Sequence, residues 1–214
     1  YVGGELCQDV AIYFSFDSKV DFSSNGKRVS DGAWDPNLPH VEASLGAAEA
    51  LRSNHIPFGV ISKGNLKALA NHKVVILPNV LRLGDEEAEA IGQYISSGGN
   101  VYASKSSMAS KLSDILGIST IRETKEKFTY VAPTSKGLAL LPEITGEYPL
   151  SVQDSQIEAK ASTGDDILAT ITLPYTDPED PTRFASSHSD PPGVATKLPA
   201  MIEKAYGRGR IIWS

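Results

Sequence analysis

The sequence predicts an α/β fold, with a doubly wound, mostly parallel sheet, helices on both faces and a C-terminal β-hairpin. Over the first 120 residues, short apolar segments alternate with segments of helical periodicity. Such alternation predicts parallel strands joined by right-handed crossovers. The segment 73–78 is apolar without interruption, as expected for a strand covered on both sheet faces. Two apolar segments on either side of 207–209 predict the hairpin.

The elements of the first half follow from local signals. The expected strands are 9–16, 58–61, 73–78 and 100–104, and the expected helices are 41–54, 66–69, 85–97 and 108–117. The first helix has one apolar face formed by Val41, Leu45, Ala48 and Leu51. The helix at 85 begins with three carboxylates, which complement the positive end of the helix dipole. Gly98 and Gly99 end that helix.

The second half is expected to contain short strands and long connections. The strands are predicted at 128–131, 157–161 and 167–171, before a hairpin over 200–213. The segment 174–199 contains six prolines and is predicted to be turn-rich. The polar segment 17–39 is a long loop without periodicity. Loops of this length are usually functional, so both long segments are expected to be contact surfaces.

Composition and charge exclude several classes of protein. Lys and Arg total 20 and Asp and Glu total 26, which gives a net charge of −6. This balance argues against nucleic acid as a partner, since such proteins need a clustered basic face. No apolar segment approaches the roughly 20 residues of a membrane helix, and no signal peptide is visible, so a cytoplasmic location is expected. A single cysteine, Cys7, excludes an intrachain disulfide, and neither a metal nor a cofactor is expected.

The ends of the chain shape the prediction of its domain organisation. The sequence starts at Tyr1 without a methionine and stops at Ser214, directly after an expected strand. We interpret residues 1–214 as one domain excised from a longer polypeptide.

Three segments carry a resemblance to a known family. They are 40–61, which ends in ALRSNHIPFGVI, 72–104, which reads HKVVILPNVLRLGDEEAEAIGQYISSGGNVYAS, and 201–214, which reads MIEKAYGRGRIIWS. Together they resemble the β-galactosidase trimerisation domain of bacterial glycoside hydrolases, a relative of the class I glutamine amidotransferase fold. The segment SSHSDPPG at 186–193 resembles the one seen where this domain follows a glycosyl hydrolase barrel. The resemblance implies a flavodoxin-like, non-catalytic domain in carbohydrate metabolism, with an upstream catalytic domain and further copies of the chain as partners.

A catalytic site within this domain would need a nucleophile on the turn after the fourth strand. Active amidotransferase-like proteins place it on a sharp strand-to-helix turn, where backbone N–H groups face the oxyanion. Here the turn, 103–108, has no cysteine and lacks the glycine spacing of such an elbow. Its serines are interpreted as helix caps. A hydrolase that uses Ser104, Ser106 or Ser107 stays open as an alternative.

Four residues are candidates for ligand or interface contacts. Asp17 follows the first strand, at the sheet edge where this class of fold binds ligands, although it could equally cap the loop. Trp34 could stack on a sugar, pack at an interface, or anchor its own loop. His188 and Asp190 lie in a polar loop that could contact a sugar or a neighbouring domain, or bond only to backbone. A sugar contact by Tyr13 is a further possibility.

Glycosidases use paired carboxylates, and each carboxylate pair in this sequence has another interpretation. Glu86 and Glu87 fit a first helical turn, Asp165 and Asp166 fit a turn, and Asp17 with Asp21 lies in the long loop. The catalytic pair of the parent enzyme is therefore expected upstream. We predict a non-catalytic accessory domain that supports oligomerisation or interdomain packing. A carbohydrate-contacting domain and a serine hydrolase are the alternatives.

Overall fold

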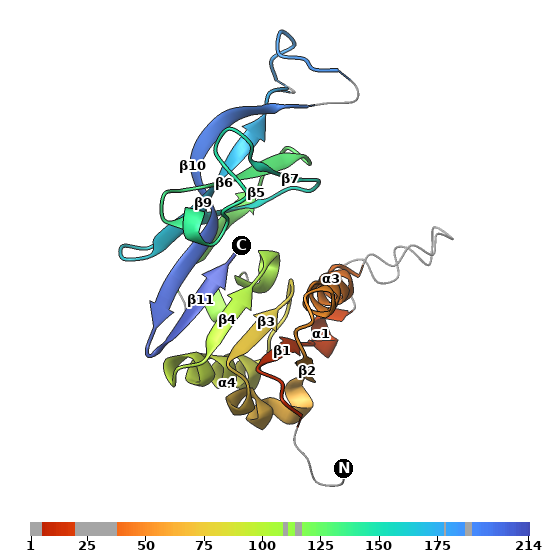
Figure 1. The fold of residues 1–214 in the computed structure, drawn as a ribbon, viewed down its shortest axis with the longest axis vertical. Helices are drawn as coiled ribbons and strands as arrows, with labels where there is room; N and C mark the ends of the chain where they lie inside the picture. The colour runs from red at the N-terminus through yellow and green to blue at the C-terminus, as the bar shows by residue number, and fades with distance from the viewer. Residues whose placement is uncertain (1–5, 20–37, 109–110, 114–116, 178, 187–189) are drawn as a thin grey trace, which may run out of the picture. The chain divides into compact units, whose positions relative to one another are not determined.

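The computed structural model of the protein describes residues 6–19, 38–108, 111–113, 117–177, 179–186 and 190–214 (Figure 1). The chain forms two compact units. The first comprises Tyr1–Leu116 with Ala205–Ile211, and the second comprises Gly117–Lys204 with Ile212–Ser214.

The first unit is built on a parallel sheet. Its strands are β1 (Val10–Tyr13), β2 (Phe58–Ile61), β3 (Val74–Leu77) and β4 (Asn100–Ala103), in the order β2-β1-β3-β4. All three strand pairs in this group are parallel. Strand β11 (Gly209–Trp213) follows β4 in the sheet order. The predicted α/β class with a mostly parallel sheet is therefore confirmed, as are the four predicted strands of this half.

The helical segments of the first unit follow the strands in the predicted order. They are α1 (Phe16–Lys19), α3 (Pro39–Ser53), η1 (Lys63–Asn71), α4 (Asp85–Ser96) and η2 (Lys105–Met108). Helix α1 lies at the start of the segment predicted as loop, most of which falls outside the described residues. The helix predicted at 108–117 is described only at 108, 111–113 and 117, so it stays a prediction. Among the described helices, none combines the length and apolar content that a bilayer crossing requires.

The buried face of α3 differs from the predicted one. Leu45 is 66% exposed, whereas His40, Ser44 and Leu51 are buried. The buried face thus begins with two polar residues, which the apolar periodicity could not identify. Both have hydrogen-bond partners, because Ser44 Oγ donates to the His40 carbonyl at 2.7 Å and the His40 ring is bonded at both nitrogens.

Helix α4 begins and ends as predicted. Its N-terminal carboxylate Glu87 accepts the Gly84 N–H at 2.7 Å, so it caps the helix directly. At the other end Gly98 has φ +115°, a conformation that favours glycine.

The second unit is antiparallel. Its sheet has the order β10-β9-β6-β7, with β6 (Thr129–Pro133), β7 (Leu150–Val152), β9 (Asp166–Pro174) and β10 (Pro192–Tyr206). A separate antiparallel pair joins β5 (Ser119–Glu123) to β8 (Ile157–Lys160). Ala169, Ile171 and Ala200 form a buried cluster. The structure confirms the strands predicted near 128–131, 157–161 and 167–171, and β5 and β7 were not predicted.

Strand β10 occupies the last part of the segment 174–199, which was predicted to be turn-rich. The strand already begins at Pro192. Proline removes a ladder hydrogen bond and is tolerated at strand starts and bulges. Pro192 is the first residue of the strand, and the register against β9 shifts on both sides of Pro199. The predicted hairpin is present, with β10 and β11 adjacent in the sheet order and Gly207 at φ +60° in the connecting turn.

Candidate functional site

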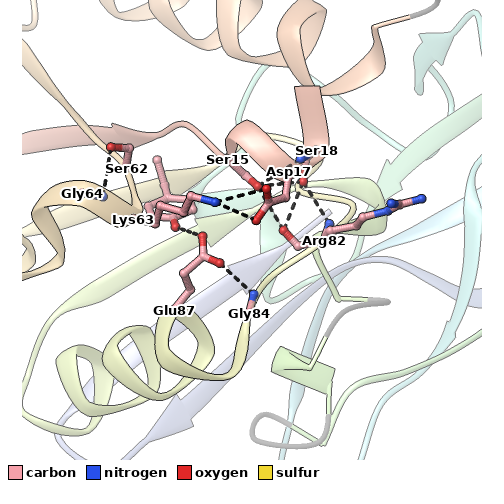
Figure 2. Close-up of polar contacts among 10 residues, drawn as sticks. Ser15, Asp17, Ser18, Ser62, Lys63, Gly64, Arg82, Gly84 and Glu87 are labelled. Carbon is pink, nitrogen blue, oxygen red and sulfur yellow. Dashed lines mark hydrogen bonds and ion pairs between the residues drawn. The ribbon is translucent and has the colours of Figure 1, made fainter. Parts of the chain in front are cut away.

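The carboxyl ends of β1 and β3 mark the point where the strand order reverses. The chain passes from β1 to β2 on one side, and from β3 to β4 on the other. Open α/β sheets bind ligands in the crevice at such a reversal. Here residues 14–19, which follow β1, meet residues 78–84, which follow β3, and Figure 2 shows their polar contacts.

Two serine hydroxyls connect these segments. Ser15 Oγ donates to the Arg82 carbonyl at 3.0 Å, and the Arg82 N–H donates to Ser18 Oγ at 2.9 Å. Ser18 Oγ also lies 2.9 Å from Ser15 Oγ, and the Ser18 N–H donates to Ser15 Oγ at 3.2 Å. Both serines are buried. Backbone and hydroxyl groups that could otherwise bind a ligand at the reversal point are therefore bonded to each other.

His40, the second residue of α3, extends this network. The Ser15 N–H donates to Nε2 at 2.9 Å, so Nε2 must be unprotonated. The ring proton then lies on Nδ1, which donates to the Pro78 carbonyl at 2.7 Å. Burial lowers the pKa of His40, which agrees with a neutral ring. Sequence reasoning missed this residue, although its spacing from Ser44 and Leu51 follows one helical face.

A second buried group joins β1 to α4. The Tyr13 hydroxyl donates to Glu87 Oε1, while the Gly84 N–H donates to Glu87 Oε2 at 2.7 Å. Burial, followed by the hydrogen bond to Glu87, raises the pKa of Tyr13 well above its ordinary value. Tyr13 is 0% exposed, so the possibility that it contacts a sugar is wrong. Glu87 does more than complement the helix dipole, because it also holds a tyrosine 74 residues away in sequence.

Asp17 lies beside the carboxyl end of β1, on α1. Its carboxylate forms an ion pair with Lys63 at 3.1 Å, and both side chains are 50% exposed (Figure 2). An exposed pair of this kind contributes little to stability. Asp17 therefore has a charged partner within the chain, and a contact with an outside ligand stays a prediction.

The turn after β4 contains a residue with a positive φ angle. Lys105 has φ +47°, and so does Asn79, which follows β3. The two turns are bonded together, because Ser104 Oγ accepts the Asn79 N–H at 3.0 Å and Asn79 Oδ1 accepts the Ser106 N–H at 3.1 Å. The Ser106 N–H therefore already has an acceptor within the chain.

The Ser107 hydroxyl is likewise bonded to the backbone of the chain. It is 0% exposed, accepts the Val80 N–H at 2.8 Å and donates to the Leu77 carbonyl at 2.8 Å. A nucleophile must be exposed to substrate and bonded to a general base. Ser107 does not meet the first condition and its hydroxyl donates to a backbone carbonyl, and Ser104 Oγ faces a backbone donor. These contacts favour the structural interpretation of the serines over the catalytic one.

Asp190 lies in the second unit and is bonded to its own surroundings. Its carboxylate accepts the Thr176 N–H at 3.1 Å and the Thr176 hydroxyl, and its carbonyl accepts the Tyr130 hydroxyl. These bonds join the residues that follow β9 to those that precede β10. The other two predicted contact residues, Trp34 and His188, lie outside the described residues, so their roles stay predictions.

The described surface also contains a groove at the opposite edge of the parallel sheet. It has a volume of about 760 Å³, lies between η1 and α4, and is lined by Leu69, Tyr94 and Asn100 among others. Neither Asp17 nor Asp190 lines it. In the part of the chain that the structure describes, no three His, Cys, Asp or Glu side chains are grouped to hold a metal ion.

Comparison with known proteins relates the fold to parts of larger enzymes. No protein-family model matches the chain, and no curated protein matches it. The β-galactosidase from Rahnella sp. R3 matches with a TM-score of 0.65 and 20% identity over 96% of this chain. The β-galactosidase from Bacillus circulans sp. alkalophilus gives 0.65 and 16% over 96%, and α-L-fucosidase isoenzyme 2 from Paenibacillus thiaminolyticus gives 0.64 and 22% over 96%.

This chain corresponds to only a part of each matched enzyme. This chain spans 28% of the length of each of these three enzymes. A likeness at this identity shows the fold. It confirms the predicted resemblance, since the chain has the fold of a trimerisation-domain-like part of such enzymes.

Proposed function

We propose that residues 1–214 act as one non-catalytic accessory domain of a glycoside hydrolase, supporting oligomerisation or interdomain packing. The observation that carries the proposal is the filled reversal point of the sheet. The side chains of Ser15, Ser18 and His40 form hydrogen bonds with the backbone there. Asn79 Oδ1 accepts the Ser106 N–H in the turn after β4. A structural role is compatible with a site filled by its own chain, whereas catalysis needs an accessible one. The fold likeness to 28% of several glycoside hydrolase chains supports the same role.

The arrangement of helices proposed for this domain is the doubly wound, flavodoxin-like one. Right-handed crossovers place α3, between β1 and β2, on one face of the sheet. The crossovers through η1 and α4 run in the opposite direction and belong on the other face. The contacts between η1 and α4 support this assignment. The upstream catalytic domain and further copies of the chain are the proposed partners, and the cytoplasmic location stays a prediction.

Light scattering tests the proposed self-association. The monomer has a mass of 22.9 kDa. We expect a dimer or trimer that persists on dilution, and we expect the Trp34→Ala variant to weaken it if the long loop forms the interface. A monomer at every concentration would contradict self-association by this domain. Interdomain packing would then be tested in the full-length enzyme, by comparing its thermal stability with and without residues 1–214.

The serine-hydrolase alternative makes a separate prediction. In the turn after β4, Ser104 Oγ accepts the Asn79 N–H and Ser107 is fully buried. Ser106→Ala is therefore the informative variant. We expect the unaltered chain and the variant to hydrolyse generic esters at the rate of buffer alone, because the Ser107 N–H, which would follow a Ser106 nucleophile, already donates to the Ser104 carbonyl at 3.1 Å. Ester hydrolysis by the unaltered chain that is lost in Ser106→Ala would support the serine-hydrolase alternative.

A contact with carbohydrate would depend on Trp34 or His188, since the Asp190 carboxylate is bonded to Thr176.

A further inference from the structure

The His40 side chain joins three separate segments at the reversal point. Its ring lies at the start of α3, accepts from the backbone after β1 and donates to the backbone after β3. The Phe14 ring packs on it with a centroid distance of 5.1 Å. The imidazole is 0% exposed. The proposed accessory function does not require a titratable group at this position.

We infer that His40 is an acid-sensitive latch, whose protonation releases the start of α3 from the carboxyl ends of β1 and β3. The Ser15 N–H needs a lone pair on Nε2. A protonated ring has donors at both nitrogens and no acceptor. Two donors would then face each other in a buried site, and the Ser15 N–H would lose its partner. Opening of this segment would let the ring and the amide reach water.

In the described part of the chain, the charged groups on the elements around the ring are paired elsewhere or exposed. They are Asp17 and Lys19 on α1, Glu42 on α3 and Arg82 after β3. Asp17 is paired with Lys63, and Glu42 and Arg82 are exposed. Burial is the largest cause of the lowered pKa of His40, and the backbone at Pro78 and Asn79 opposes it.

The direction of the pH effect follows from this lowered pKa. The unfolded or opened chain takes up a proton below the ordinary pKa of about 6.5, whereas the closed form does so only at a lower pH. The open form therefore binds more protons in this window, and stability falls as pH falls from about 6.5. Stability from the neutral ring is complete above that pH.

Hydrogen exchange at single residues tests the latch. We expect the protection of the Ser15 and Ser44 amides, corrected for intrinsic rates, to fall about tenfold or more between about pH 7 and about pH 5. Val75 and Val101, in the centre of the sheet, should keep their protection. The His40→Gln variant should lose this pH dependence, and His55→Gln, at an exposed histidine, should retain it.

Three outcomes would overturn the inference. They are equal protection at both pH values, a uniform loss across the first unit, and a pH dependence that survives in His40→Gln. If His40→Gln does not fold, NMR titration of the unaltered protein replaces it. The His40 ring signals must then titrate over the same pH range as the loss of protection at Ser15, and a mismatch would reject the latch.

Discussion

Replacing Glu87 by alanine should lower the free energy of unfolding of the first unit by about 3 to 5 kcal/mol. The carboxylate is 5% exposed and accepts from two groups, the Tyr13 hydroxyl and the Gly84 N–H. Alanine would leave both donors without an acceptor. Tyr13 is 0% exposed, so its hydroxyl has no access to water in the native state. The substitution would also remove the cap of α4.

Two further variants separate the hydrogen bonds from the charge. In Glu87→Gln the amide oxygen can accept the Gly84 N–H, but the amide nitrogen cannot accept the Tyr13 O–H, so only part of the stability should return. Glu86→Ala removes an exposed carboxylate from the same helical turn, where it complements the helix dipole, and should lower the unfolding midpoint only slightly. Urea denaturation followed by circular dichroism measures all three. Equal midpoints for Glu87→Ala and Glu86→Ala would show that the buried contacts add nothing.

Much of the parallel sheet could be predicted because each strand is locally encoded. The segments that form β2 and β3 are short, apolar and bounded by breaking residues, and these signals need no knowledge of the partner strand. Strand β10 could not be predicted in the same way. Its prolines are acceptable because Pro192 begins the strand and because the register shifts around Pro199. A bulge is a property of two paired strands, and the sequence of one of them does not reveal it.

The candidate site shows the same limit. Fold class alone placed Asp17 at the carboxyl end of β1, where the structure has it. The roles of His40 and Glu87 depend on partners that are 25 and 74 residues away in sequence. Periodicity also misjudged α3, because it counts apolar residues and treats a buried histidine as polar. A polar side chain can face the core when its hydrogen bonds are satisfied there, and those bonds come from the tertiary structure.

The same substitution, glycine to alanine, should have opposite effects at Gly209 and at Gly46. A Cβ at Gly209 would lie 2.0 Å from the Gly99 carbonyl oxygen and 2.3 Å from the Ile95 carbonyl oxygen. Both atoms belong to the backbone at the end of α4, so neither can rotate away. The strand and the helix would have to separate, and we expect a loss of about 3 kcal/mol or more.

Gly46 is the matched control, since it lies within α3 and a Cβ there meets no atom within 4 Å. Alanine at this exposed helical position should stabilise the first unit by about 0.5 to 1 kcal/mol, because glycine loses more backbone entropy on helix formation. Thermal unfolding measures both variants, and about 1 kcal/mol corresponds to roughly 2 to 4 °C in a chain of this size. Gly46→Ala should therefore melt a few degrees higher, and Gly209→Ala about 6 °C lower or more. A shift of the same sign in both would mean that the close approach of β11 to α4 does not limit the side chain at 209.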